Sequence, residues 1–201
     1  MAGGYVVGSL PVGLWLAKAI GNIDVREHGS GGTGTTNVLR TVGPAAAGTV
    51  FILDVAKGSV AVGMARRLGT DPGTQAAAGV AAVIGHSWPL FARFRGGKGV
   101  ATAFGSLISL SGTGTASAVV GGVTSLALTR VVSVGSLAAA TSATLGTAAA
   151  AVTRQGGAAA FGFCAAAAPL IAYRHRANIE RLLRGTEPTL SFRRGRAPRP
   201  A

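Results

Sequence analysis

The sequence predicts an all-α polytopic membrane protein, a bundle of seven transmembrane helices, and three observations carry this prediction. Only 12% of the 201 residues are charged, about half of the roughly 25% that is usual in soluble domains. The mean hydropathy is +0.45, and long apolar runs alternate with short basic segments. The net charge of +13 suits anionic lipids or phosphorylated substrates. A nucleic-acid-binding domain needs a more highly charged surface, so we expect no nucleic acid among the partners.

Seven apolar segments are candidates for membrane spans, since about 20 residues at about 1.5 Å each cross the hydrocarbon core. Residues 99–129 are too long for one helix, and Gly112 and Gly114 predict a break into two short helices. Alanine and glycine dominate the segments, which predicts helices packed closely against one another. The expected spans are 3–20, 44–65, 76–92, two within 99–129, 132–153 and 156–173.

Basic residues predict the orientation of the bundle, because loops rich in Lys and Arg stay in the cytoplasm. With seven spans and the N-terminus outside, fifteen basic residues fall on the inner side and three on the outer side. The inner group is Lys18, Arg26, Arg40, Arg93, Arg95, Lys98, Arg130, Arg174, Arg176, Arg181, Arg184, Arg193, Arg194, Arg196 and Arg199. The outer group is Arg66, Arg67 and Arg154. We therefore expect the C-terminus to be cytoplasmic.

The chain becomes polar after the last span. In "RHRANIERLLRG", Ile179, Leu182 and Leu183 lie at helical spacing with arginines opposite, which predicts a short interfacial helix. Gly185 suits its C-terminal end. The arginine-rich residues that follow predict disorder and attraction to anionic head groups. The expected organisation is a membrane-integral domain over 1–188 and a basic tail over 189–201.

The glycine-rich segment "HGSGGTGTTNVLR", residues 28–40, predicts a site for an anion. Gly29 and Gly31 let the backbone approach a ligand with its N–H groups. A helix that starts near Asn37 would direct its N-terminus at the same anion. Ser30 can donate a hydroxyl proton, and Arg40 offers a planar fork to phosphate oxygens. The alternative is a flexible connecting loop, since the spacing is not that of a P-loop.

A second glycine-rich segment, "GHSWPLFARFRGGKGVATAFG", covers residues 85–105. Trp88 suits a membrane interface. Gly96 and Gly97 free the backbone, and Lys98 supplies a mobile ammonium group. An ordinary positive-inside loop is the alternative. The Gly-Gly-Lys-Gly run is more than topology requires, which favours a functional anion site.

Two ionisable residues, Asp54 and Lys57, fall inside a predicted span, where charge is costly and usually functional. Their spacing of three residues allows them to pair, and both a structural link between helices and a substrate role stay open. His86 lies at the end of a span, where a hydrogen-bonded helix terminus is a simpler interpretation than catalysis. His28 in the first glycine-rich segment has a weaker case still.

The tail helix places His175 and Asn178 three residues apart and therefore on one face. Glu180 follows His175 at the fifth position, which leaves a His175–Glu180 dyad as an alternative. The six carboxylates are scattered without ligand spacing, so neither a metal nor a cofactor is expected. The single cysteine, Cys164, is expected to be a small buried residue.

Six stretches, in this order along the chain, resemble the bacterial membrane acyltransferases that move an acyl chain from acyl phosphate to glycerol 3-phosphate. They are "GSLPVGLWLAK", "HGSGGTGTTNVLRTVG", "DVAKG", "GHSWPLFARFRGGKGVAT", "RVVSVGS" and "YRHRANIERLLRGTEP", which together cover most of residues 8–188. The resemblance implies a seven-helix bundle in the bacterial inner membrane, with an active site open to the cytoplasm. It implies acyl phosphate and glycerol 3-phosphate as substrates, membrane lipids as partners, and 1-acyl-glycerol 3-phosphate as an early product of phospholipid biosynthesis.

The resemblance also assigns roles to individual residues. The family's phosphate-binding serine and arginine correspond to Ser30 and Arg40, and its loop lysine corresponds to Lys98. The expected catalytic residues are Ser30, Arg40, Lys98 and His175. The expected substrate-binding residues are Gly29, Gly31, Asn37, Gly96, Gly97, Ser136 and Asn178.

One departure from the family pattern concerns the first glycine-rich segment. The family usually has "GSGNxGATN" where this chain has "GSGGTGTTN", so Gly32 replaces an asparagine and Thr35 replaces an alanine. Any contact of that asparagine side chain is therefore missing. The His-x4-Asp signature of soluble acyltransferases is also absent, because Phe91 follows His86 at that spacing.

Two functions other than acyl transfer fit parts of the sequence. A small membrane transporter of an organic phosphate would also use cationic loops within a bundle, although we find no inverted repeat of the kind that transporters carry. A structural binder of anionic lipids would explain the arginine-rich tail. It would not explain the two glycine-rich segments.

Overall fold

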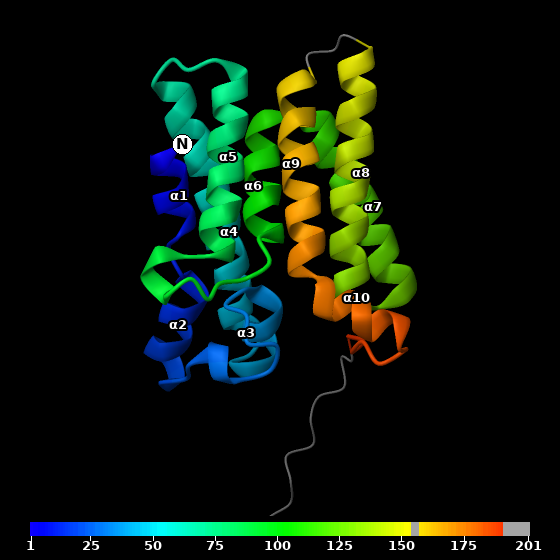
Figure 1. Ribbon diagram of the computed structural model, residues 1–201. Coiled ribbons are helices and arrows are strands. Elements are labelled where there is room, and N and C mark those ends of the chain that lie inside the picture. Colours follow the sequence, from blue (N-terminus) through cyan, green and yellow to red (C-terminus); the bar gives the residue numbers. More distant parts are fainter. Residues whose placement is uncertain (154–156, 191–201) are drawn as a thin grey trace, which may run out of the picture.

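The computed structural model describes residues 1–153 and 157–190, and all regular structure in these residues is helical. The prediction of an all-α protein is therefore confirmed for the described part of the chain. Figure 1 shows the arrangement of the helices. The elements are α1 (Ala2–Gly8), α2 (Val12–Gly21), η1 (Val25–Glu27), α3 (Thr35–Thr41), α4 (Pro44–Arg67), α5 (Pro72–Ser87), η2 (Leu90–Ala92), α6 (Val100–Leu110), α7 (Gly112–Thr129), α8 (Val132–Val152), α9 (Ala158–Arg174) and α10 (Arg176–Leu183).

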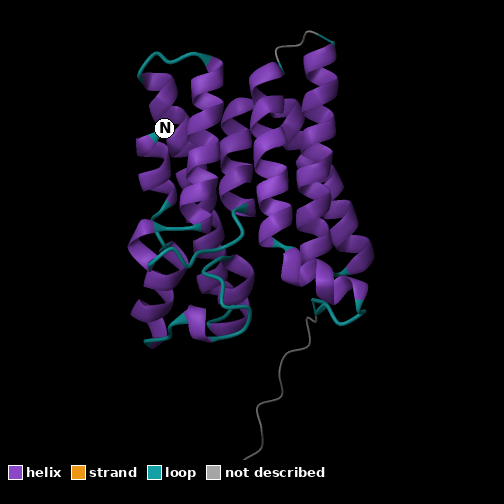
Figure 2. Ribbon diagram, in the orientation of Figure 1, coloured by secondary structure: helices purple, strands orange, loops and turns teal. Residues whose placement is uncertain are grey.

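The helices form two groups that lie side by side, α1 to α6 in one and α7 to α10 in the other (Figure 1), and α9 packs against α5 and α6 to join them. From α4 to α9 each helix runs in the direction opposite to the one before it. The segments after α2, between α5 and α6, and after α9 therefore gather at one end of the bundle. Figure 2 shows that the longer loops lie at this end.

Each of the seven predicted spans corresponds to helix in the structure. Within residues 1–153 and 157–190, three helical stretches are long and apolar enough to cross a membrane, Ala2–Gly21, Pro44–Arg67 and Val132–Val152. The break predicted within 99–129 occurs at Ser111, where the Oγ atom accepts a hydrogen bond from the Gly114 N–H at 3.0 Å and caps α7. Ser111, as well as the two glycines, therefore separates α6 from α7.

The first span, predicted as one helix over 3–20, is instead broken between α1 and α2. Pro11 has no N–H to donate and its ring excludes a continuous helix, so α1 ends at Gly8 and α2 begins at Val12. The Leu10 carbonyl at the break accepts a hydrogen bond from Lys57 Nζ at 3.1 Å. The third span, predicted over 76–92, is also shorter at its C-terminal end, because α5 stops at Ser87.

Small residues allow the close packing that the composition predicts. A Cβ atom on Gly8 of α1 would clash with the Ala82 carbonyl of α5, and one on Gly105 of α6 would clash with the Val55 carbonyl of α4. Large apolar side chains such as Ile52, Val120 and Leu145 point outward and are about two-thirds exposed, at 65%, 66% and 67%. An outer surface of this kind suits lipid and not water.

The polar C-terminal segment forms α10, which confirms the predicted helix. Gly185 follows it with a φ of +68°, the left-handed conformation that glycine adopts most readily after a helix. Most of the basic tail predicted over 189–201 lies outside the described residues, as does Arg154.

Candidate active site

A cavity of about 240 Å³ lies at the end of the bundle where the loops gather. It brings together residues from the first glycine-rich loop and α3, the second glycine-rich loop, α4, α5, the start of α8, and α10. The residues on its walls are Ser30, Gly32, Gly34, Thr35, Thr36, Asn37, Arg40, Phe51, Asp54, His86, Gly97, Lys98, Gly99, Val100, Ala101, Val132, Ser133, Ser136, His175, Asn178 and Glu187.

The cavity unites most of the residues that the sequence predicts for a site. All four predicted catalytic residues line it, Ser30, Arg40, Lys98 and His175. Of the predicted substrate-binding residues, the cavity walls include Asn37, Gly97, Ser136 and Asn178. Gly29, Gly31 and Gly96 are not on the walls, and their contribution is to the shape of the two loops.

Asn37 organises the first glycine-rich loop. Its buried side chain accepts a hydrogen bond from the Ser30 N–H at 2.9 Å. Its amide nitrogen shares its two hydrogens among the carbonyls of Val25, His28 and Gly32, at 2.7, 3.0 and 2.8 Å. The amide hydrogens of Asn37 are thus engaged by the loop, so this residue holds Ser30 in place at the cavity wall.

Two glycines supply the turns of this loop. Gly29 and Gly31 have φ values of +59° and +70°, in the left-handed region that other residues rarely enter. A Cβ atom on Gly29 would also clash with Asn37 Oδ1. The predicted helix begins at Thr35, two residues before Asn37, because Gly34 provides its extended N-terminal residue.

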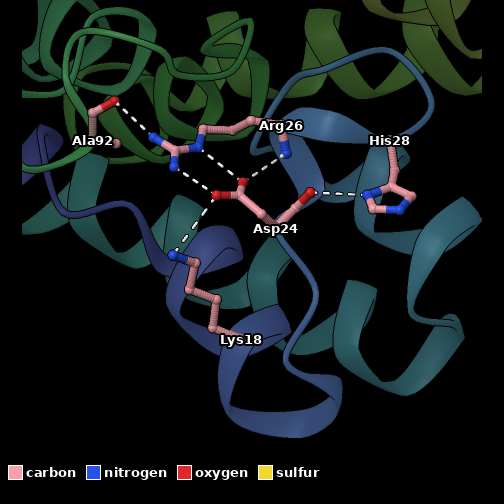
Figure 3. Close-up of polar contacts among 5 residues, drawn as sticks. All are labelled: Lys18, Asp24, Arg26, His28 and Ala92. Atoms are coloured by element: carbon pink, nitrogen blue, oxygen red, sulfur yellow. Dashed lines mark hydrogen bonds and ion pairs between the residues drawn. The ribbon is translucent and has the colours of Figure 1, made fainter.

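An ion-pair cluster ties the first loop to the second, as Figure 3 shows. The Asp24 carboxylate accepts hydrogen bonds from Arg26 Nε at 2.9 Å and Nη2 at 2.6 Å, and Lys18 Nζ lies 3.7 Å away. The remaining terminal nitrogen of Arg26 donates to the Ala92 carbonyl at 3.2 Å, in the second loop. These hydrogen bonds from Arg26 hold the pKa of Asp24 well below its usual range.

The second glycine-rich loop packs tightly beneath Lys98. Arg174 at the end of α9 donates from Nε to the Gly97 carbonyl at 3.0 Å and from Nη2 to the Gly96 carbonyl at 3.2 Å. The Arg174 guanidinium also lies over the Trp88 ring, 5.3 Å from its centroid. A side chain on Gly96 would clash with the His86 carbonyl. Gly96 and Gly97 lie so close to His86 that neither position has room for a side chain.

Lys98 is held in a partly buried position at the cavity wall. Burial lowers its pKa to about 8, against the opposing influence of the Glu187 carboxylate. The positive charges of Arg181, Arg40 and Arg174 lower it further. Lys98 of the second loop and Arg40 of α3 give the cavity two cations from separate elements, an arrangement that favours an anion.

Glu187 closes the cavity on the side of α8 and α10. Its Oε1 accepts hydrogen bonds from Ser133 Oγ at 2.8 Å and Asn178 Nδ2 at 2.5 Å, and its Oε2 accepts from Arg181 Nε at 2.7 Å. Burial acts to raise the pKa of Glu187, but these three hydrogen bonds outweigh it and lower the pKa. The carboxylate therefore stays ionised and joins the start of α8 to α10.

His175 is buried and electrically neutral at physiological pH. Its Nδ1 lies 2.8 Å from the Ile171 carbonyl, so the ring carries its proton there and leaves Nε2 as an acceptor. Burial, and then the charge of Lys98, lowers its pKa to about 4. The alternative His175–Glu180 dyad is wrong, because Glu180 is exposed and pairs with Arg184 at 2.6 Å.

Sequence reasoning gave no site role to Arg174, Ser133 or Glu187. Glu187 had the clearest available signal, as one of only six acidic residues in a strongly basic chain. Asp54 and His86 also reach the cavity wall. The predicted Asp54–Lys57 ion pair forms, with Lys57 Nζ 2.8 Å from Asp54 Oδ1.

A second, apolar cavity of about 290 Å³ adjoins the polar one. Both cavities share Phe51, Val100, Ala101, Val132 and Ser136 on their walls. The apolar cavity continues between α6, α7, α8 and α9, where small residues such as Gly122 and Ala139 leave room. The polar cavity thus borders an apolar one. This arrangement suits a reactant that has an anionic head group and an apolar chain.

Comparisons with known proteins agree with this geometry. The family model described as glycerol-3-phosphate acyltransferase matches residues 1–185. The glycerol-3-phosphate acyltransferase of Desulforudis audaxviator is 44% identical over 190 residues, which are 94% of this chain and 93% of that protein. The corresponding protein of Rubrobacter xylanophilus is 40% identical over 200 residues, which are 96% and 94% of the two chains.

Two solved structures have the same fold. They are crystal structures of PlsY (YgiH), described as an integral membrane glycerol 3-phosphate acyltransferase, in a glycerol 3-phosphate form and a lysophosphatidic acid form. Their TM-scores are 0.84 and 0.82, at 35% identity over 94% of this chain and 92% of theirs. A family match over nearly the whole chain, in a structure that gathers the family's motif residues in one cavity, shows that this chain belongs to the glycerol-3-phosphate acyltransferase family.

Proposed function

We propose that this protein transfers an acyl group from acyl phosphate to the C1 hydroxyl of glycerol 3-phosphate, giving 1-acyl-glycerol 3-phosphate and phosphate. The observation that carries the proposal is the pair of cavities: Arg40 and Lys98 line the polar one, and the apolar one adjoins it. Membership of the family supports the acceptor, since the matched crystal structures include a glycerol 3-phosphate form and a lysophosphatidic acid form. Acyl phosphate fits as donor because both of its ends match the two cavities.

Binding requires that two phosphates share one small space, although they repel each other. Arg40 and Lys98 offset this repulsion, and the Ser30 hydroxyl adds a donor at the same wall. Ser136 and Asn178 face the cavity from α8 and α10 and contact the glycerol 3-phosphate. Gly29, Gly31, Gly96 and Gly97, with Asn37, keep the two loops in the shape that these contacts need.

The chemical step needs no covalent intermediate, because acyl phosphate already carries a good leaving group. The C1 oxygen forms a bond to the acyl carbon, the bond from that carbon to the phosphate oxygen breaks, and the hydroxyl proton leaves with the phosphate. His175, with a pKa of about 4, is too weak a base to keep this proton. Its Nε2 orients the hydroxyl by accepting its hydrogen bond before the reaction, and the proton turns to the phosphate oxygen as the C–O bond forms. Lys98 and Arg40 stabilise charge on the departing phosphate.

The acyl chain occupies the apolar cavity between α6, α7, α8 and α9. Its carbonyl end then lies near Ser136, at the border that the two cavities share. This placement lets the chain enter from the surrounding lipid while the phosphate stays in the polar cavity.

The orientation follows from the same arrangement. The loop end of the bundle carries α10 (Figure 1) and the cavity whose walls include Arg40 and Lys98. By the positive-inside rule such an end is expected in the cytoplasm. The N-terminus is then outside and the C-terminus inside, in the inner membrane of a bacterial cell. Cytoplasmic glycerol 3-phosphate has direct access to the cavity in this orientation.

In the decisive experiment the protein is purified in detergent. It is then given glycerol 3-phosphate together with either acyl phosphate or acyl-CoA. We expect 1-acyl-glycerol 3-phosphate from acyl phosphate alone, measured by mass spectrometry. A preference for acyl-CoA would contradict the proposed donor. No product from either donor would return the transporter to consideration, because detergent removes the gradient that transport needs but leaves acyl transfer intact.

A further inference from the structure

A chain of buried polar groups runs from the break in the first span to the second glycine-rich loop. It begins at the Leu10 carbonyl, which accepts a hydrogen bond from Lys57 Nζ at 3.1 Å. Lys57 pairs with Asp54 Oδ1 at 2.8 Å, and the same oxygen lies 3.4 Å from His86 Nδ1. Asp54, Lys57 and His86 are only 1%, 6% and 5% exposed. Such a cluster within a membrane bundle is costly and calls for a function.

The link between Lys57 and Leu10 explains only the first part of this chain. It stabilises the break at Pro11, and a Lys57–Asp54 pair alone would serve that purpose. It does not explain why His86 lies beyond Asp54 at the cavity wall. The last group in the chain therefore has a second task, at the cavity.

His86 contacts the second loop with both its backbone and its ring. The Gly97 N–H donates to the His86 carbonyl at 3.1 Å. A Cβ atom on Gly97 would clash with His86 Nε2, and one on Gly34 of the first loop would lie 4.0 Å from the same nitrogen. The imidazole ring thus stands between the two glycine-rich loops, and Lys98 is the residue directly after Gly97.

We propose that Asp54 and His86 are positioning residues of the active site. Asp54 orients the imidazole of His86, and the imidazole contacts Gly97 and fixes the position of the loop. Lys98 then faces the cavity. Neither residue contacts the substrates. The inference deepens the proposed function, because it explains how one of its two cations is placed. It also accounts for a histidine and a carboxylate at the wall of a site for anions.

The environment of Lys98 offers a readout that needs no turnover. Burial lowers its pKa to about 8, and the charged groups that act on it are Glu187, Arg181, Arg40 and Arg174. When the loop is no longer seated, Lys98 becomes solvated and its pKa returns toward the ordinary value of 10.5. The chain has only two other lysines, Lys57 and the half-exposed Lys18, so each can be followed separately.

The test is competitive acetylation with a trace of acetic anhydride between pH 6 and 11, followed by mass spectrometry. We expect a Lys98 labelling midpoint near pH 8 in the unmodified protein and a rise of one pH unit or more in Asp54→Asn and His86→Asn. Lys18 serves as the internal reference and should not move. His28→Asn is the matched control, because His28 is exposed and lies outside the cavity.

Gly97→Ala gives an independent perturbation, since its methyl group displaces the loop while His86 stays intact. It should reproduce the raised midpoint, and in all three variants the KM for glycerol 3-phosphate should rise about tenfold or more. Thermal unfolding in detergent identifies any variant that does not fold, and the remaining variants then decide the test. An unchanged Lys98 midpoint in folded Asp54→Asn and His86→Asn overturns the proposal, even if activity is lost. Failure of the unmodified protein to use acyl phosphate would instead overturn the proposed function and leave the labelling result valid.

Discussion

The two glycine-rich loops reach the same cavity but are held in different ways. The first loop, residues 22–34, is shaped by near neighbours: Asn37 contacts carbonyls between five and twelve residues away. The second loop, residues 88–99, is held by Arg174, 77 and 78 residues further along the chain. One half of the site is therefore a local structure, whereas the other half forms only when the bundle is assembled.

Arg26 connects the first loop to the second. Arg26 bonds locally to Asp24 and reaches across to the Ala92 carbonyl, 66 residues away (Figure 3). Because the first loop is held mainly by the local hydrogen bonds of Asn37, damage to it should stay near Ser30 and Arg40. Damage to the second loop should instead disturb its contact with α9, through Arg174. Mutations can test each side of this contrast.

The largest effect is expected from removing either cation of the cavity, Arg40 of α3 or Lys98 of the second loop. Arg40→Ala and Lys98→Ala should each lower kcat/KM about 100-fold or more, because a preorganised charge next to a phosphate is lost. Arg95→Ala is the control, since Arg95 is exposed and does not line the cavity. Activity assays with acyl phosphate, together with thermal unfolding, would measure this. Near-normal turnover in either variant removes that residue from the site.

Arg174→Ala should have the next largest effect and sharpens the contrast most. It leaves the carbonyls of buried Gly96 and Gly97 without a donor, at a cost of about 1–3 kcal/mol in unfolding free energy. We expect kcat/KM to fall about 10- to 100-fold as Lys98 loses its support. Arg176→Ala is the matched control, because the Arg176 side chain is exposed and stacks on Tyr173. Equal behaviour of the two variants would contradict the role of Arg174.

Asn37→Ala should have a smaller and more local effect. The loop loses the acceptor for the Ser30 N–H and the donor to three carbonyls, so we expect the KM for glycerol 3-phosphate to rise about tenfold. Thr49→Ala, on an exposed part of α4, provides a control. The thermal midpoint should change less than in Arg174→Ala, as measured by unfolding in the same detergent. A larger loss of stability than in Arg174→Ala would reverse the comparison of the two loops.

The smallest effect concerns pH. Because the pKa of Lys98 is lowered to about 8, its positive charge is present below that pH and is lost as the pH rises through it. We expect kcat/KM to decline up to about tenfold between pH 8 and pH 9. Lys98→Arg keeps its charge throughout this range, so its profile should stay flat there even if its activity is lower. A decline that persists in Lys98→Arg would assign the titration to another group.

Much of the fold could be predicted because it depends on local physical rules. Apolar length predicts the spans, basic residues mark the loop end, and the break near Gly112 appears at the neighbouring Ser111. The unbroken first span was the main error, since a proline near the middle of an apolar run is also compatible with a kinked helix. Lys57 stabilises the break that Pro11 causes, because it donates a hydrogen bond to the Leu10 carbonyl from a different helix.

The residues of the site also divide into those that the sequence predicts and those that it does not. Ser30, Arg40 and Lys98 stand out in the sequence because glycines and cations cluster around them. Arg174, Glu187 and Ser133 do not, because their partners lie tens of residues away or carry no recognisable motif. Asp54 and Lys57 could be paired from their spacing, but the contact with His86 depends on how α4 and α5 pack.

The residues along the chain are enough to identify a helical membrane protein with two glycine-rich, cationic loops at one end. Helical periodicity, apolar length and backbone freedom at glycine act over a few residues, so they can be read along the chain. The folded bundle was needed to show that Arg40 and Lys98 share one cavity, that an apolar cavity adjoins it, and that Arg174 bonds to the second loop. These features depend on close approach between helices. The small residues permit such contacts, but which helices meet is settled only when the bundle packs.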